Sequence, residues 1–266
     1  GICVPSRTSF MTGLYPRTTG CLDNPNKPPH HADLDLLQHV FQRSGYRTGC
    51  FGKRHLPNIG ELALGWDRSA TTINPKQDPS DENYYDFVTA RGQWEAHKRD
   101  FGGSHDADLM SRITEVREEN RTSTYATEKS LDFLKKCRDA NQPFFCWTSY
   151  IFPHQPYTPL KKWAELYPPE EMELPESVTE PLENLPPEMQ SWRRNTRRPW
   201  NLGTAAKDHD LYRRYVAYYY ALTSEVDACV GRLMDGLERM GLRENTIVIY
   251  TADHGDLLGD LGRFFK

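Results

Sequence analysis

The sequence lacks long apolar runs, a surplus of positive charge and closely paired cysteines. No stretch approaches the roughly 18 consecutive apolar residues that a membrane span needs. The 33 Lys and Arg residues are mixed with 37 Asp and Glu residues along the whole chain, so no basic face for nucleic acid is expected. The six cysteines form neither CxxC pairs nor the dense pattern of a disulfide scaffold. These absences favour a soluble protein without a membrane span or a nucleic-acid partner.

The length and the two ends bound the domain organisation. At 266 residues the chain suits one large domain with a buried core. It begins at Gly1 without an initiator Met and stops at Lys266 directly after a motif-dense segment, so we expect both ends to be cut from a longer protein. The missing signal peptide is then uninformative, and the location stays open between cytoplasm, periplasm and secretion.

Helices and strands alternate along the chain. Apolar periodicity predicts helices, and short apolar runs predict strands, of which the middle one suits a buried parallel strand. The helices are expected over residues 6–13, 34–44, 127–137 and 211–240, and the strands over 46–52, 143–151 and 246–252. Residues 60–121 and 156–199 are expected to form loops, short elements and a surface excursion. This pattern is typical of an α/β fold.

A polar cluster follows each predicted strand. Lys53 and His55 follow the first strand, His154 follows the second, and Asp253 with His254 follows the third. In open α/β sheets the ligand crevice lies outside the carboxyl ends of the strands. We therefore expect these side chains to converge.

Cys3 lies near the start of the first predicted helix, with Arg7 one turn further on. A helix N-terminus and a guanidinium both favour an anion, so Cys3 is a candidate activated thiol. Taken alone, a cysteine in this position is more often a small buried side chain. The string from Cys3 to Gly13 contains Cys-x-Pro-Ser-Arg followed by Thr-Gly. It resembles the signature of the formylglycine-dependent sulfatases.

That resemblance implies a specific chemistry for Cys3. In the family the cysteine is converted to formylglycine by a maturation enzyme, and Arg7 is implied to hold the modified residue. One hydroxyl of the hydrated aldehyde attacks sulfur and displaces the alcohol. The other hydroxyl then collapses to the aldehyde and expels sulfate. A thiol could not do this.

Two further strings are similar to family motifs. Gly-Tyr followed by Gly-Lys-Arg-His around Lys53 resembles the family's Gly-Tyr and Gly-Lys-Trp-His pattern, with Arg54 in place of the usual Trp. It implies that Lys53 neutralises a sulfate oxygen and that His55 bonds the nucleophile's hydroxyl. Pro-His-Gln-Pro resembles the family's Pro-His-x-Pro and makes His154 the general acid or leaving-group donor. Without the other family-like motifs, His55 and His154 would each be interpreted as an ordinary surface or loop residue.

The last string, from Asp253 to Lys266, is similar to the family's Asp-His-Gly run that ends in Lys. It implies that Asp253 and His254 are metal ligands, with calcium expected first and magnesium or manganese as alternatives. Lys266 would be a second lysine that contacts the substrate's sulfate, whereas Leu261 replaces the second His of many relatives. The upstream strand whose paired Asp residues complete the metal site in relatives is not in this sequence, so the chain as it stands is expected to be inactive.

The resemblance implies an alkaline-phosphatase-like α/β fold, with a mixed, mostly parallel sheet flanked by helices, and a partial sulfatase catalytic domain over residues 1–266. The expected activity is hydrolysis of a sulfated small molecule or sulfated glycan. Two alternatives stay open. The same motifs occur in phosphonate monoester and phosphodiester hydrolases of this fold, and a non-catalytic binding relative could have kept the fold and lost maturation.

Overall fold

The computed structural model describes residues 1–24, 34–57, 65–73, 80–102, 110–194 and 209–266. Its contacts divide the chain into two compact units. The first comprises Gly1–Ala90, Glu119–Ile151 and Ala228–His254, and the second comprises Arg91–Glu118, Phe152–Asp227 and Gly255–Lys266. The expectation of a single catalytic domain over 1–266 stays a prediction.

A four-stranded parallel sheet is the centre of the first unit. The strand order is β3-β2-β1-β4, with β1 (Arg47–Gly52) paired to β2 (Arg68–Thr71) on one side and to β4 (Phe144–Ser149) on the other. The short β3 (Glu82–Asn83) extends the sheet beyond β2. The predicted strands over 46–52 and 143–151 are therefore confirmed, and both are parallel as an α/β fold requires.

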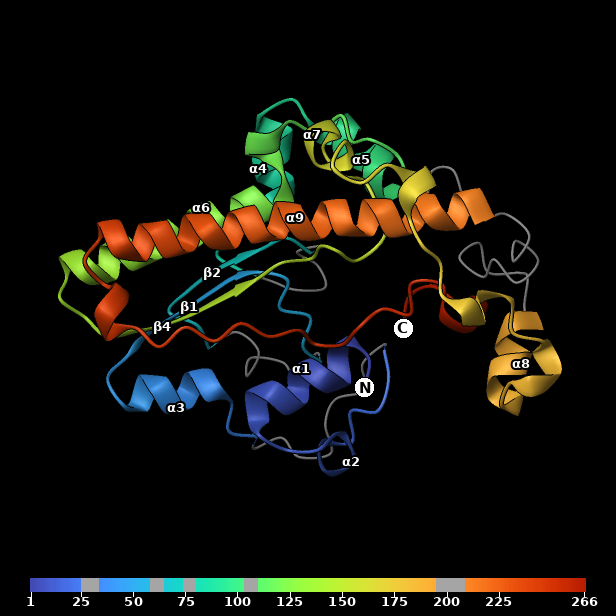
Figure 1. Ribbon diagram of the computed structural model, residues 1–266. Helices are drawn as coiled ribbons and strands as arrows, with labels where there is room; N and C mark the ends of the chain where they lie inside the picture. Colours follow the sequence, from blue (N-terminus) through green and yellow to red (C-terminus); the bar gives the residue numbers. More distant parts are fainter. Residues whose placement is uncertain (25–33, 58–64, 74–79, 103–109, 195–208) are drawn as a thin grey trace. The chain divides into compact units, whose positions relative to one another are not determined.

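Helices cover both faces of this sheet (Figure 1). The long α6 (Thr122–Asp139) packs on one face, where the Phe133 ring lies 5.4 Å from the Phe51 ring of β1. On the other face, α1 (Cys3–Thr12) and α3 (Leu37–Arg43) enclose an apolar cluster. Its members come from α1, from the residue before α3, from β1 and from the segment between β1 and β2: Met11, Leu36, Cys50, Leu56 and Trp66. Alternate residues of β1 point to opposite faces, as the pleat dictates.

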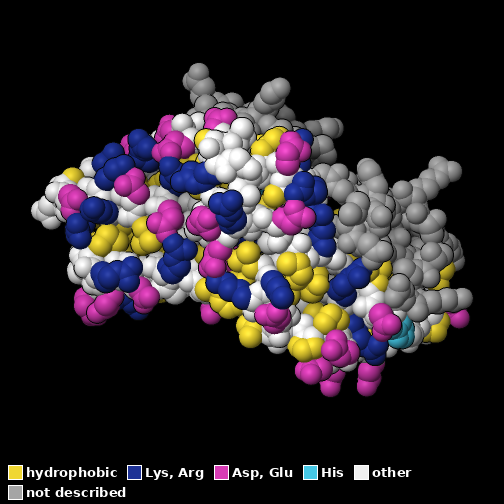
Figure 2. Space-filling model, turned by 90° about the horizontal axis from the view of Figure 1, so that it is seen from above, with side chains coloured by type: hydrophobic (Ala, Val, Ile, Leu, Met, Phe, Trp, Pro, Cys, Tyr) yellow, Lys and Arg dark blue, Asp and Glu magenta, His cyan; other side chains and the backbone are white. Residues whose placement is uncertain are grey.

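The remaining helices belong to both units. The first unit also contains α2 (Pro16–Thr19) and α4 (Tyr84–Ala90), and the second contains α5 (Trp94–Gly102), α7 (Lys161–Ala164) and α8 (Pro187–Arg194). The helix α9 (His209–Arg239) confirms the prediction over 211–240, and Gly241 follows it at a φ of 67°. Of the helices in the described ranges, none is long and apolar enough to cross a membrane. On the face shown in Figure 2, basic and acidic side chains are interspersed.

The predicted strand over residues 246–252 is wrong. Residues 246–252 form no strand, and Ile247, Ile249 and Tyr250 are 91%, 75% and 75% exposed. β-Branched and aromatic residues favour a strand only when a neighbouring strand pairs with the backbone and covers the side chains. Within the described residues, β4 pairs with β1 alone and nothing pairs with this segment.

Strands β2 and β3, of four and two residues, lie in the stretch 60–121, for which loops and short elements are predicted, and the described part of that prediction is confirmed. Both strands are too short for a periodic signal, and side-chain bonds help to place them: Ser69 N–H donates to Asp81 Oδ2 at 2.7 Å. The same stretch contains the helices α4 and α5. The parts of that expectation on residues 60–64, 74–79 and 103–109 lie outside the described residues, as does 195–199 in the expected surface excursion.

Gly52 at the end of β1 offers the first testable prediction. Its φ is 106°, and a Cβ there would lie 1.9 Å from the Ser149 carbonyl oxygen of β4. We expect Gly52→Ala to lower the free energy of unfolding by about 3 kcal/mol or more, because overpacking adds to backbone strain. The matched control is Gly13→Ala, at a φ of 70° with no atom within 4 Å of the new Cβ, for which backbone strain alone costs about 1–2 kcal/mol. If urea denaturation showed equal losses in the free energy of unfolding for the two variants, the close approach of Gly52 to the Ser149 carbonyl would be contradicted.

Candidate active site

Cys3 is the first residue of α1 and is 1% exposed. Its Sγ lies 3.2 Å from His254 Nε2 and 3.4 Å from Lys53 Nζ. The positive end of the helix and the lysine both favour a negative charge at this position. The sequence prediction of Cys3 at a helix N-terminus is confirmed, and Lys53 and His254 converge on it from positions far apart in the chain.

Arg7 links the segments of the first unit that surround Cys3. Its Nε donates to Asp253 Oδ2 at 2.7 Å, and its side chain is 9% exposed. One terminal nitrogen of the guanidinium donates to the carbonyl oxygen of Lys53 at 2.6 Å and to Ser149 Oγ at 2.9 Å. The planar fork of arginine is suited to several such bonds at fixed angles, which lysine could not make. Arg7 therefore joins α1, the ends of β1 and β4, and the segment that carries Asp253.

Asp253 and His254 are held beside Cys3 without a preceding strand. Ser6 Oγ donates to the Asp253 carbonyl oxygen at 2.5 Å, and Asp253 Oδ1 lies 3.6 Å from His254 Nε2. Burial raises the pKa of the Asp253 carboxyl, but the charge and hydrogen bond of Arg7, aided by Lys53, lower it more, so this pKa lies below its ordinary value. The carboxylate is thus stabilised as an anion by the cations around it.

His55 follows Lys53 in a strained backbone conformation. Its φ is 47°, a left-handed value that residues other than glycine rarely adopt. Its Nδ1 is buried and has no hydrogen-bond partner among the described residues. Buried polar atoms are normally paired, so this nitrogen is left available to a ligand.

His154 and Lys266 belong to the second unit. His154 Nδ1 lies 2.6 Å from the carbonyl oxygen of Gln155, which orients the ring. Lys266 follows two buried phenylalanines, and the Leu257 N–H donates to the Phe265 carbonyl oxygen at 2.9 Å, so the last residues fold back on their own segment. That these two side chains join Cys3 stays a prediction.

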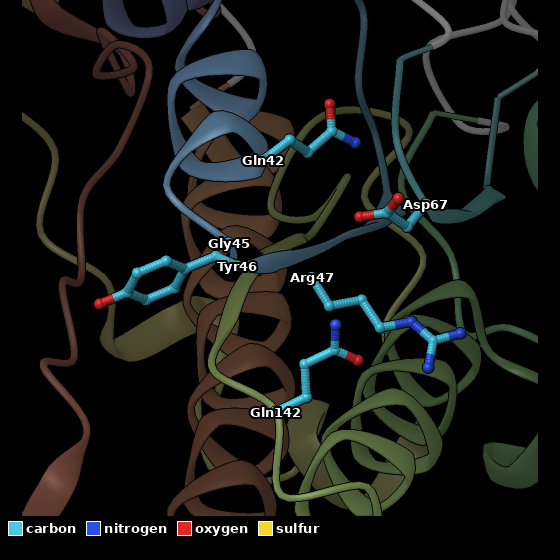
Figure 3. Close-up of a pocket in the computed structure, with 6 residues that line it drawn as sticks. All are labelled: Gln42, Gly45, Tyr46, Arg47, Asp67 and Gln142. Atoms are coloured by element: carbon cyan, nitrogen blue, oxygen red, sulfur yellow. The ribbon is translucent and has the colours of Figure 1, made fainter.

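A cavity lies at the opposite end of β1 from Lys53 (Figure 3). Its volume is about 690 Å³, and it is lined by Gln42, Gly45, Tyr46, Arg47, Asp67 and Gln142. β1 has six residues, so about 17 Å separate its two ends. The cavity is therefore distinct from the cluster around Cys3.

A family model described as Sulfatase matches residues 1–265. The chain belongs to the sulfatase family. Human iduronate 2-sulfatase is 30% identical over 275 residues, an alignment that covers 100% of this chain and 48% of that relative. The chain therefore spans about half the length of this curated relative.

Solved structures show the same fold. The phosphonate monoester hydrolase of Silicibacter pomeroyi has a TM-score of 0.77 at 22% identity, covering 99% of this chain and 55% of that one. A structure solved in complex with its substrate D-glucosamine-2-N,6-O-disulfate has a TM-score of 0.63 at 21% identity, with 99% and 58% covered. The parallel sheet flanked by helices is thus the sulfatase form of the alkaline phosphatase fold, as predicted.

The cluster in this sulfatase chain fits a divalent cation. One donor atom each from Cys3, Asp253 and His254 lies within 4.8 Å of the other two. The Asp253 carboxylate suits a hard cation, and the imidazole widens the choice to manganese and zinc. The sequence motif had assigned Asp253 and His254 to a metal, and the geometry adds Cys3 to the same small group.

Sequence reasoning missed Ser149 and Ser6 as part of the site. Ser149 was only the polar end of an apolar run, and its hydroxyl accepts from Arg7 because β4 ends beside β1. Ser6 was part of the signature and had no separate role. Ser149 is a polar residue at the end of a strand, and the neighbouring strand ends beside a candidate functional residue. This pattern is the signal that would have found Ser149.

Proposed function

We propose that the whole protein hydrolyses sulfate esters, with Cys3 as the precursor of its nucleophile. The observation that carries the proposal is the placement of Cys3 at the start of α1, within 3.4 Å of Lys53 Nζ and 3.2 Å of His254 Nε2. The reacting atom of the side chain at position 3 would thus lie close to Lys53, whose positive charge would attract the sulfate group of the substrate. The name of the curated relative, iduronate 2-sulfatase, supports the same reaction class.

The role of Lys53 follows from its position. Its ammonium group is buried, 5% of the residue being exposed, and it points at the residue that would attack. A cation in a partly dry site stabilises the charge that develops on sulfate oxygens in the transition state. His55, with its available Nδ1, would bond the attacking hydroxyl or a sulfate oxygen.

Formylglycine at position 3 would supply a diol whose second hydroxyl allows the sulfated enzyme to break down without attack by water. A formylglycine-generating enzyme or an equivalent maturase is therefore a proposed partner. Arg7 would fix the position of the first turn of α1 relative to Lys53 and Asp253, because it donates hydrogen bonds to both residues.

Asp253 and His254 would hold a divalent cation, with calcium as the first proposal and magnesium or manganese as alternatives. Such a cation would polarise the sulfate and the nucleophile's hydroxyl. Arg7 bonds Asp253 Oδ2 and so leaves Oδ1, the oxygen nearer His254 Nε2, on the side of the cation.

His154 and Lys266 complete the proposed machinery. His154 would protonate the leaving alcohol, since an imidazole can give up a proton near neutral pH. Lys266 would contact the sulfate as the second lysine. The substrate class proposed is a sulfated glycan or a sulfated small molecule, in line with the disulfated glucosamine bound by a protein of the same fold.

A phosphonate monoester or phosphodiester hydrolase is the second candidate. The Asp253–His254 pair favours this candidate. Phosphonate monoester and phosphodiester hydrolases that resemble this chain have the same Asp-His pair, whereas many sulfatases have Asn in place of the His. Kinetics with matched aryl sulfate, phosphate diester and phosphonate monoester substrates decide between the two. We expect the highest kcat/KM for the sulfate ester, and a clear preference for either phosphorus ester would overturn the sulfatase proposal.

A non-catalytic relative is the third possibility, and the mass of the whole protein tests it. Conversion of Cys3 to formylglycine removes the sulfur and lowers the intact mass. We expect that loss after co-expression with a maturase. A retained thiol together with no turnover of any of the three esters would favour a binding role.

Lys53→Ala and His154→Ala test the assigned roles. We expect kcat to fall by about 100- to 1,000-fold for Lys53→Ala and by a similar or larger factor for His154→Ala. The matched control is Lys136→Ala, which removes an exposed lysine paired with Asp132 on α6 and should leave kcat unchanged. The His154 effect should shrink with substrates that have a more acidic leaving alcohol. Unchanged rates in both variants would remove these residues from the site.

A further inference from the structure

The cavity at the amino end of β1 has the size of a small-molecule site but a polar lining. Its volume of about 690 Å³ falls within the range of about 300–1,000 Å³ that is typical of such sites. Most of those sites are lined mainly by apolar side chains, whereas this lining includes an arginine, an aspartate and two glutamines and no aliphatic residue. All of its residues belong to the first unit. The lining therefore suits a hydrophilic ligand.

Arg47 supplies the positive charge of this cavity. It is the first residue of β1, and its backbone N–H donates to the Pro143 carbonyl oxygen at 2.8 Å, which fixes the start of the side chain. The residue is half-buried, and its guanidinium has no ion-pair or hydrogen-bond partner among the described residues. The planar fork of arginine matches carboxylates and tetrahedral oxyanions, to which it can donate two parallel hydrogen bonds. Arg47 is therefore a candidate anchor for an anionic group.

Asp67 and Gln42 are held in place by Thr48 and keep acceptor atoms for a ligand. Thr48 donates to Asp67 Oδ2 from its N–H at 2.7 Å and from its hydroxyl at 3.0 Å. Gln42 Nε2 donates to Thr48 Oγ1 at 2.9 Å and to the Gly65 carbonyl oxygen at 2.8 Å. Neither Asp67 Oδ1 nor Gln42 Oε1 has a hydrogen-bond partner in the described ranges. These two oxygens can accept hydrogen bonds from hydroxyl groups.

Gln142 adds an amide that can both donate and accept hydrogen bonds. Its backbone N–H donates to the Cys137 carbonyl oxygen at 2.9 Å, and in Figure 3 its amide points toward the Arg47 side chain. Asp67 lines the same cavity, so a ligand that is only an anion would meet a like charge as well as Arg47. A ligand that carries hydroxyl groups beside its anionic group would satisfy both residues.

We propose that this cavity binds a sugar unit that carries a carboxylate or a sulfate group. The anionic group lies against Arg47 and the Gln142 amide, and ring hydroxyls donate to Asp67 Oδ1 and Gln42 Oε1. The length of β1, about 17 Å, separates this site from Lys53, so the sugar bound here is not the one that reacts at Cys3. Binding at this site does not depend on the hydrolysis proposed above.

Ligand-observed NMR on the whole protein tests this site, with D-glucuronate and D-glucose 6-sulfate as probes. We expect at least one of these charged sugars to bind, and D-glucose and acetate to bind at least about 10-fold more weakly, because each lacks half of the contacts. Arg47→Ala should weaken binding of the charged sugar by about 10- to 100-fold, the effect of losing a hydrogen-bonded charge. Gln142→Ala, at an exposed residue, should weaken it less. The matched control is Arg43→Ala, which removes an arginine that pairs with Asp35 and does not line the cavity.

Two further variants separate the outcomes. Asp67→Asn keeps one oxygen for the bonds from Thr48 and removes the negative charge, so it should lower the ratio of charged-sugar affinity to acetate affinity. Lys53→Ala should leave sugar binding unchanged, which distinguishes this cavity from the cluster around Cys3. The assay needs no turnover, so a failure of the proposed hydrolysis would not affect it. No binding of either charged sugar, equal binding of acetate, or binding that survives both Arg47→Ala and Gln142→Ala would overturn the proposal.

Discussion

Cys3→Ala is expected to lower kcat for the proposed ester hydrolysis by at least about 10⁴-fold, because it removes the proposed precursor of the nucleophile. Lys53 and His254 both contact the side chain at this position, at 3.4 and 3.2 Å. Alanine leaves the first turn of α1 intact, so the free energy of unfolding should change far less than the rate. The measurement is steady-state kinetics of the matured whole protein on the ester that it prefers.

The control for this substitution is Cys21→Ala. Cys21 is also buried, and burial raises the pKa of its thiol, as expected of an inert cysteine. Its replacement should cost some stability and leave kcat near that of the unsubstituted protein. If Cys3→Ala turned over substrate at the normal rate, Cys3 could not be the nucleophile precursor, whatever its sequence context.

Arg7→Ala is expected to have the largest effect on stability at the site. Arg7 is 9% and Asp253 19% exposed at their side chains, and the 2.7 Å pair is reinforced by bonds to the Lys53 carbonyl and to Ser149. Removing one member of such a pair leaves the other charge poorly solvated, so we expect a loss of about 3 kcal/mol in the free energy of unfolding. Turnover should also fall, because Asp253 and the backbone of Lys53 lose their common anchor.

The matched control is Arg43→Ala. Arg43 also pairs with an aspartate, Asp35, but their side chains are 61% and 53% exposed. Exposed pairs contribute about 1 kcal/mol or less, so this change should be nearly neutral in urea denaturation. Arg7→Lys should lie nearer to Arg7→Ala than to the unsubstituted protein, because lysine lacks the planar fork. Equal effects of Arg7→Ala and Arg43→Ala would show that burial does not strengthen the Arg7 pair.

Local pattern was enough to predict the long helices and the central strands. The spacing of apolar residues predicted α6 and α9, and Gly13 at a φ of 70° ends α1 where the sequence placed a helix stop. The apolar run after residue 143 became β4, which pairs with β1. The expectation that this strand is buried is wrong for the described residues, because β4 has a partner on one side only and all of its residues except Ser149 are half-buried. Strand β2 could not be foreseen, since four residues carry no period and its partner is β1.

The failed strand over residues 246–252 shows the limit of propensity. Its composition favours a strand, yet Ile247 is 91% exposed and no described strand pairs with the segment. A strand is stabilised by its neighbours rather than by its own residues. Even so, the polar pair that ends this segment reaches Cys3, because Arg7 and Ser6 bind Asp253 directly.

The strings around Cys3, Lys53, His154 and Asp253 carry the sulfatase resemblance in short, local patterns, so the candidate reactive groups could be named from the sequence alone. Which of these groups meet depends on the fold. Cys3 and His254 are 251 residues apart and come within 3.2 Å, and Ser149 joins Arg7 because β4 ends beside β1. Chemistry is a property of side chains and can be read locally, whereas a distance between remote residues depends on how the sheet and helices pack.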